Sequence, residues 1–387
     1  MFARLLPILG ITFIDILGFS ILIPILPYYV QHFGASYVVV GLLFATFAFC
    51  QFFSGPLWGN VSDRIGRKRV LVISQIGATF GWTLLAFAPT LLWVFVARIV
   101  EGVSGGNISV TQAYVADRTA PEERTRAFAY IGATFSAGIV FGPLMGGVLL
   151  AHYGYRTPFL CAAALQVVTL LATIFFLPEK VARTADAPAA RLSDVARYLA
   201  DRNVSPVLVQ KFAFSLGMYA WFAAFALFVH VLLGYGAAQT SYVFAAFGAV
   251  SVVMQLAVVG RLTDRLGTRA ASNVGFAAAC VFFALVPAAH TAAMLLGALA
   301  VFAFALAVTN ATIPTLLTDV SPERVRGTVL GVGSSLDSIA GVVMPAISTG
   351  VLGAYGPAWT AALPACFSCV ALGLGIAAQR RRAVPSE

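Results

Sequence analysis

The sequence predicts an all-α polytopic membrane protein with twelve transmembrane helices in two pseudo-symmetric six-helix bundles. Three observations support this prediction: a very apolar composition, a series of apolar runs long enough to cross a bilayer, and a polar string that occurs twice. The hydrophobic fraction is 60%, the charged fraction is 10% and the mean hydropathy is +0.91, far from the values of a soluble globular domain. The composition therefore indicates a membrane protein.

The expected elements are apolar runs near the roughly 20 residues that a helix needs to cross a bilayer. In the first half of the chain these runs cover residues 5–29, 37–58, 70–88, 91–114, 127–151 and 157–177. In the second half they cover residues 204–232, 241–259, 271–289, 292–316, 327–351 and 358–378. Each half therefore contributes six spans.

One sizeable polar segment separates the two halves. We expect residues 1–178 to form the N-terminal six-helix bundle, 179–203 a cytoplasmic linker, and 204–387 the C-terminal bundle with a short basic tail. The other loops are short, so they leave no room for a soluble catalytic domain.

The basic residues predict the orientation. With the N-terminus placed inside, 21 of the 24 Lys and Arg residues lie in inner segments, Arg156 lies outside, and Arg98 and Lys211 lie within spans. Inner loops of membrane proteins are enriched in such residues. We therefore expect a multi-pass protein of the cytoplasmic (inner) membrane with both termini in the cytoplasm. The net charge of +9 reflects this bias, and no clustered basic face supports nucleic-acid binding.

The repeated polar string indicates an internal duplication. Gly59-Asn-Val-Ser-Asp63-Arg64-Ile-Gly66 recurs 201 residues later as Gly260-Arg-Leu-Thr-Asp264-Arg265-Leu-Gly267. Repeats of this kind in apolar chains are typical of transporters. A second pair of similar strings, which begin at Asp117 and Asp319, follows spans 4 and 10.

These motifs resemble the major facilitator superfamily over essentially the whole chain. The string from Gly59 to Lys68 is similar to the signature loop of that superfamily, and its weaker copy stands where the family places it. Span 5 resembles the signature of drug/proton antiporters. Span 1, with Asp15-Ile-Leu-Gly18, and span 4, with Arg98-x-x-x-Gly102, resemble the twelve-span antiporters that include tetracycline exporters.

The resemblance implies that the signature loop latches the two halves together while the outward-facing state is populated. The residues concerned are Gly59, Asp63, Arg64, Gly66 and Arg67, with Asp264 and Arg265 in the second copy. We expect Gly59 and Gly66 to let the chain turn closely between spans 2 and 3. Alternatively, the cations only follow the inner-loop bias, but an acid that recurs within a basic loop favours a specific partner.

Span 5 combines small residues with a proline. Its glycines allow another helix to approach closely, and its proline permits a bend. The residues are Gly138, Gly142, Pro143, Gly146 and Gly147. The resemblance implies a flexing seam between the halves, whereas the alternative is ordinary small-residue packing.

Five charged residues lie within the spans: the acids Asp15, Glu101 and Asp337, and the cations Arg98 and Lys211. Charges at such depth are costly, so they are candidates for function. Arg98 and Glu101 are one helical turn apart and can share a face. Three acids face two cations, and an apolar medium disfavours a charged carboxyl group, so we expect one acid to be protonatable near neutral pH.

Asp15 is our first choice for the proton site, with Arg98 and Glu101 as a pair that its protonation perturbs and Asp337 as a further candidate. Alternatively, Arg98 and Glu101 form a static strut and Asp15 caps polar backbone. Lys211 either extends towards the inner interface or pairs with Asp337.

The candidate substrate contacts are polar or aromatic residues on spans that line the cavity in this fold: Gln51, Asn107, Thr111, Gln112, Tyr219, Trp221, Gln255 and Asn310. Each of them could instead join helices to one another. Tetracycline exporters carry a histidine in span 8 and an acid in span 9, but spans 8 and 9 of this chain contain neither, which argues against tetracycline as the substrate.

These observations predict a secondary active transporter, a proton-coupled exporter of amphipathic small molecules or drugs by alternating access. The alternatives are a proton-linked importer or uniporter of a small metabolite, and a non-transporting receptor or lipid-handling protein on the same fold. We expect a monomer in the lipid bilayer with a small molecule and protons as partners. The residue patterns indicate no enzyme, catalytic residue, metal site, cofactor or nucleic-acid partner.

Overall fold

The computed structural model describes residues 2–105, 110–112, 114–115, 119, 124–178, 197–198, 200–201, 204–322 and 325–383, and this part of the chain contains helices and no strand. The helices of the first half are α1 (Phe2–Gln31), α2 (Tyr37–Ile65), α3 (Arg67–Ala86), α4 (Leu91–Ser104), α6 (Arg124–Tyr153) and α7 (Arg156–Phe176). Those of the second half are α9 (Ser205–Leu233), α10 (Ala237–Ala257), α11 (Val259–Leu266), α12 (Thr268–Leu285), the 3-10 turn η2 (Val286–Ala288), α13 (Ala292–Asp319), α14 (Arg326–Tyr355) and α15 (Pro357–Ala383).

Eleven of the described helices are long and apolar enough to cross a membrane. The expected fourth span is described as α4 and the helical residues 110–112. The helices therefore agree with the all-helical, twelve-span fold that the sequence predicts.

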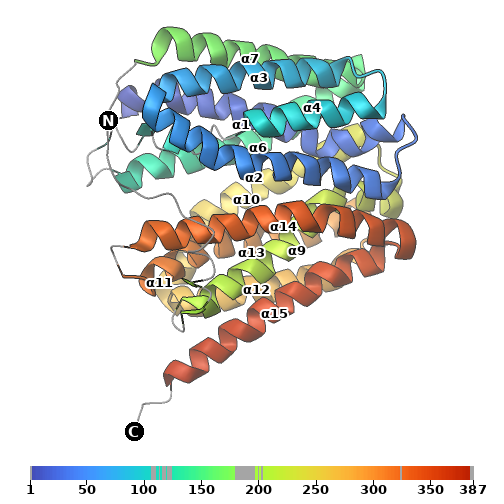
Figure 1. Ribbon diagram of the computed structural model, residues 1–387. Helices are drawn as coiled ribbons and strands as arrows, with labels where there is room; N and C mark the ends of the chain where they lie inside the picture. Colours follow the sequence, from blue (N-terminus) through green and yellow to red (C-terminus); the bar gives the residue numbers. More distant parts are fainter. Residues whose placement is uncertain are drawn as a thin grey trace. The chain divides into compact units, whose positions relative to one another are not determined.

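The chain divides into two compact units, 1–187 with 235–245, and 188–234 with 246–387. Within the first unit, α1 packs against α6 and α7, and α3 packs against α4 and α7, as Figure 1 shows for α3 and α7. Within the second unit, α9 packs against α14 and α15, and α12 packs against α13 and α15. The pairs that position the candidate site are thus α1 with α7 and α9 with α14.

The signature string does not form the loop that we expected. Helix α2 continues to Ile65, so Gly59 lies inside the helix, where an added Cβ would meet nothing within 4 Å. The prediction that Gly59 helps the chain to turn is therefore wrong, because the helix extends past the end of the apolar run. The turn is made at Gly66, whose φ of 102° is a conformation that residues with a Cβ rarely adopt.

The second copy of the string is built differently at its start. Helix α10 ends at Ala257 and the separate eight-residue helix α11 begins at Val259. Val258 between them has φ −111°, although its N–H still donates to Met254 O at 3.0 Å. The turn after α11 is again made by a glycine, Gly267 with φ 78°.

An aromatic cluster fills the interior of the second unit. Trp221 of α9 is 1% exposed and packs edge-on against Phe225, Phe228, Phe282 and Phe302. Trp221 was expected to contact substrate, but its side chain is enclosed by other rings and packs the core. Because large apolar rings favour burial against one another, we leave Trp221 out of the candidate site.

Candidate functional site

Arg98 and Glu101 form an ion pair on one face of α4, as their spacing predicts. Arg98 Nη2 lies 2.5 Å from Glu101 Oε2, and the side chains are only 2% and 5% exposed. The guanidinium carbon lies 4.6 Å from the ring centroid of Phe47 on α2, within cation–π range. Gly81 of α3 makes room for the pair, since a Cβ there would lie 2.6 Å from Glu101 Cγ. The two charges are therefore enclosed by α2, α3 and α4.

Asp15 lies on α1 and faces α7. Its Oδ1 accepts a hydrogen bond of 3.1 Å from Nε2 of Gln166, a side chain that is 5% exposed, while Asp15 itself is half-buried. The sequence did not single out Gln166, because neutral amides were considered only on the spans expected to line the cavity. A neutral amide within the apolar run of span 6 was the available signal.

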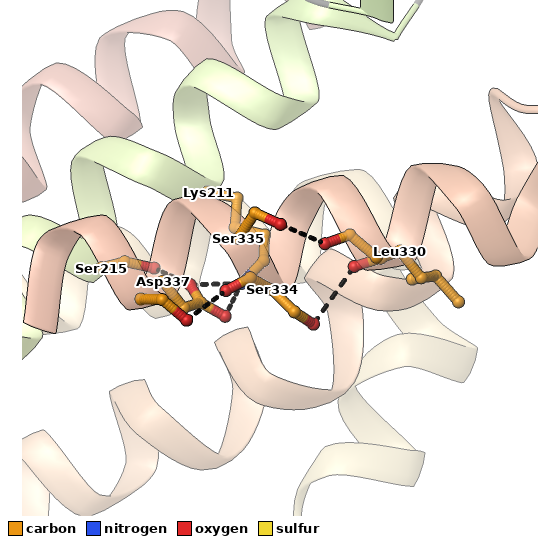
Figure 2. A network of polar contacts seen from close by, with 8 residues as sticks. Lys211, Ser215, Leu330, Ser334, Ser335 and Asp337 are labelled. Atoms are coloured by element: carbon orange, nitrogen blue, oxygen red, sulfur yellow. Dashed lines mark hydrogen bonds and ion pairs between the residues drawn. The ribbon is translucent and has the colours of Figure 1, made fainter. Parts of the chain in front are cut away.

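The second unit contains another ion pair, between α9 and α14 (Figure 2). Lys211 Nζ donates to both carboxylate oxygens of Asp337, at 2.6 and 2.5 Å, and Ser215 Oγ donates to Asp337 Oδ1 at 2.5 Å. Of the two interpretations of Lys211, the structure supports pairing with Asp337. Gly333 allows this close approach, because a Cβ there would lie 2.9 Å from Lys211 Cε. Ser215 was missed, although its position one turn after Lys211 could have indicated it.

The cations near the signature string bond to local backbone and side-chain oxygens. Lys68 Nζ donates to Ile174 O near the end of α7 at 2.7 Å, and Arg67 donates to Ser62 Oγ. Arg64 is exposed at the end of α2, and the side chain of Asp63 lies outside the described residues. In the second copy, Asp264 and Arg265 are exposed on α11.

The glycines of span 5 bring α6 close to α1. A Cβ on Gly138 would lie 2.7 Å from Ile16 Cγ2, and one on Gly142 would overlap the Ser20 hydroxyl. Ser20 Oγ donates to Gly138 O at 2.7 Å. Gly146 also faces α1, whereas Gly147 faces the first turns of α10. Pro143 follows Gly142 inside α6. These four glycines therefore pack against residues of the first unit.

The remaining candidate substrate contacts differ in exposure. Thr111 is buried and Gln51 is half-buried, while Gln112, Tyr219, Gln255 and Asn310 are exposed, and Asn107 lies outside the described residues. A polar side chain exposed on a membrane helix faces lipid at considerable cost unless it lines a water-filled cavity. The exposed residues therefore remain candidates for a cavity lining.

The chain matches the family description Major Facilitator Superfamily over residues 8–345 and 208–387. The chain belongs to this superfamily. It is therefore a multi-pass membrane transport protein and not an enzyme.

Members of the superfamily that are similar to this chain include drug-resistance proteins. It is 32% identical over 286 residues to the tetracycline resistance protein, class D, of Salmonella ordonez, covering 72% of each chain. It is 27% identical over 269 residues to multidrug resistance protein 2 of Bacillus subtilis (strain 168), covering 68% of this chain and 67% of the relative. The fold is similar to that of the human organic anion transporter MFSD10 (TETRAN), with a TM-score of 0.75 and 22% identity over 96% of this chain and 99% of that one.

Proposed function

We propose that this protein is a proton-coupled exporter of amphipathic small molecules, with Asp15 as the residue that carries the proton. The hydrogen bond between Asp15 and Gln166 is the observation on which this proposal rests. A glutamine amide carries both donors and an acceptor. Its N–H groups can therefore donate to the charged carboxylate of Asp15, and its oxygen can accept a hydrogen bond from the protonated carboxyl group. Asp15 can thus gain or lose a proton and remain hydrogen-bonded to Gln166.

The other two membrane acids are less suited to this role. Glu101 and Asp337 each form an ion pair with a cation, so a proton bound to either acid would leave Arg98 or Lys211 without its counter-charge. Asp15 is also half-buried rather than enclosed, so water can deliver a proton more readily than to Glu101. We therefore assign the Arg98–Glu101 pair to positioning α4 against α2 and α3.

The substrate class follows from the polar and aromatic residues exposed on the spans, Gln112, Tyr219, Gln255 and Asn310, with the half-buried Gln51. Polar and aromatic side chains of this kind suit a molecule that has both an apolar body and polar groups. The names of the tetracycline and multidrug relatives support the same class. We do not propose tetracycline itself, because α10 and α12 carry neither an acid nor a histidine.

In this proposal the signature string and its copy latch the inner ends of the helices, and the span 5 stripe accommodates movement during alternating access. The distribution of basic residues supports an inner-membrane location with both termini in the cytoplasm.

The test measures transport of a lipophilic fluorescent dye in proteoliposomes with an imposed pH gradient. We expect the wild-type protein to move the dye against the direction of proton flow. Asp15→Asn keeps the side-chain shape and should abolish gradient-driven transport while dye binding stays within about twofold. Asp15→Glu is the matched control, and we expect it to retain gradient-driven transport because it keeps a titratable group.

Undiminished gradient-driven transport by Asp15→Asn contradicts the role of Asp15. Dye movement in the same direction as the protons identifies an importer and contradicts the exporter as a whole.

A further inference from the structure

The second unit carries a polar stripe on one face of α9. Lys211, Ser215 and Tyr219 follow one another at four-residue spacing, which places them on the same side of a helix. Lys211 and Ser215 donate three hydrogen bonds to Asp337, and Tyr219 lies one turn further along the same face. Helix α9 therefore presents the donors and α14 supplies the carboxylate, as Figure 2 shows for Lys211, Ser215 and Asp337.

This ion pair is more open than the pair in the first unit. Lys211 is 17% exposed and Asp337 is 30% exposed, whereas Arg98 and Glu101 are almost completely enclosed. A ligand can therefore approach both charges from the exposed side. The donors on α9 are of the kinds that bind a carboxylate, and in this structure Asp337 occupies them.

Charge balance restricts which ligand can separate Lys211 from Asp337. A singly charged anion bound to Lys211 would leave Asp337 without a counter-charge within the membrane, and a singly charged cation bound to Asp337 would do the same to Lys211. An isolated charge at this depth is costly. The packed neighbours α13 and α15 carry their acidic and basic residues at the helix ends, at Asp319 and from Arg380 onward. A zwitterion replaces both halves of the pair and leaves the net charge unchanged.

We propose that this cluster is a binding subsite for zwitterionic amphipathic molecules. The carboxylate of the ligand takes the place of Asp337 on Lys211 and Ser215, and its ammonium group binds Asp337. The inference builds on the proposed transport of amphipathic molecules and names the charge class that the second unit selects.

The test is equilibrium binding to the full-length protein in lipid nanodiscs, without any pH gradient. The probes share one apolar body: ε-dansyl-lysine is a zwitterion, its methyl ester is a cation, and its Nα-acetyl derivative is an anion. We expect the wild-type protein to bind the zwitterion about tenfold or more tightly than either of the others, since a charge-assisted hydrogen bond contributes about that factor.

The variants should change the preference, not merely weaken binding. Asp337→Asn leaves Lys211 free to hold an anion, so we expect it to bind the acetyl derivative best. Lys211→Gln should bind the methyl ester best for the opposite reason. The charge-neutral double variant K211Q/D337N should bind all three probes with similar affinity, and it remains informative if a single variant fails to fold. Ser334→Ala is the matched control, because Ser334 Oγ donates to Leu330 O of its own helix and the preference should not change.

An unchanged order of affinities in Lys211→Gln and Asp337→Asn, or a double variant that still prefers the zwitterion, overturns the subsite and identifies the pair as a structural contact. Absence of zwitterion binding by the wild-type protein overturns it as well. Since this assay requires no gradient, the subsite can hold while proton-driven export fails, and the reverse can also occur.

Discussion

The close approach of α1 and α6 predicts a large difference between two glycine-to-alanine substitutions in one helix. Gly142→Ala introduces a Cβ that overlaps the Ser20 hydroxyl and lies 2.6 Å from Leu17 O. Gly132→Ala is the matched control, because a Cβ at that position of α6 meets nothing within 4 Å. The two variants make the same chemical change at sites that differ only in the neighbouring helix.

The expected magnitudes follow from these contacts. Overpacking costs about 1–3 kcal/mol, and displacing Ser20 from its 2.7 Å hydrogen bond to Gly138 O costs about 1 kcal/mol. The higher helix propensity of alanine offsets about 1 kcal/mol of this loss of stability. Gly142→Ala should therefore lower the free energy of unfolding by about 1–3 kcal/mol, whereas Gly132→Ala should raise it by up to about 1 kcal/mol.

Thermal unfolding of the purified variants in detergent measures this difference. A thiol-reactive dye reports exposure of the half-buried Cys50 and Cys161, which lie on α2 and α7 of the first unit. At about 2–4 °C per kcal/mol for a unit of 150–250 residues, we expect melting temperatures that differ by at least about 2 °C. Equal melting temperatures would refute the close packing of α6 against α1.

Two further predictions concern the enclosed pair and the turn after α2. Glu101→Gln leaves Arg98 charged in an enclosed site and should cost about 3–5 kcal/mol in the same unfolding assay, whereas R98M/E101L should be close to the wild-type protein. A double variant as unstable as the single one would contradict this view of the pair. Gly66→Ala, at φ 102°, should cost about 1–3 kcal/mol, whereas Gly59→Ala, like Gly132→Ala, should raise the free energy of unfolding by up to about 1 kcal/mol. Equal effects at the two glycines would show that the backbone of Gly66 is not the cause.

The sequence was a good guide to the spans because the thickness of a bilayer fixes the length of an apolar helix. It was a poor guide to where α2 ends. Most residues from Gly59 to Arg64 are polar or small, so the low hydropathy of this segment predicted a loop. The helix instead continues to Ile65. Polar side chains at a membrane surface are solvated by water while the backbone keeps its helical hydrogen bonds, and hydropathy does not record this.

For the candidate site, depth along a helix identified the charged residues, and spacing within one helix identified the Arg98–Glu101 pair. Contacts between helices could not be derived in this way. The pairing of Lys211 with Asp337 remained one of two alternatives, and Gln166 was not anticipated as the partner of Asp15. Which helices are neighbours depends on packing across the whole unit, and a single sequence without homologues carries no direct record of it.

The two copies of the signature string differ in how they are attached. In the first unit the string forms the end of α2, which continues as one helix to Ile65 before the turn at Gly66. In the second unit the string lies on α11, which is separated from α10 by a departure from helical geometry at Val258. A duplicated sequence thus lies on an unbroken helix in the first unit and beyond a break in helical geometry in the second, so movement of the preceding span need not reach the two copies equally.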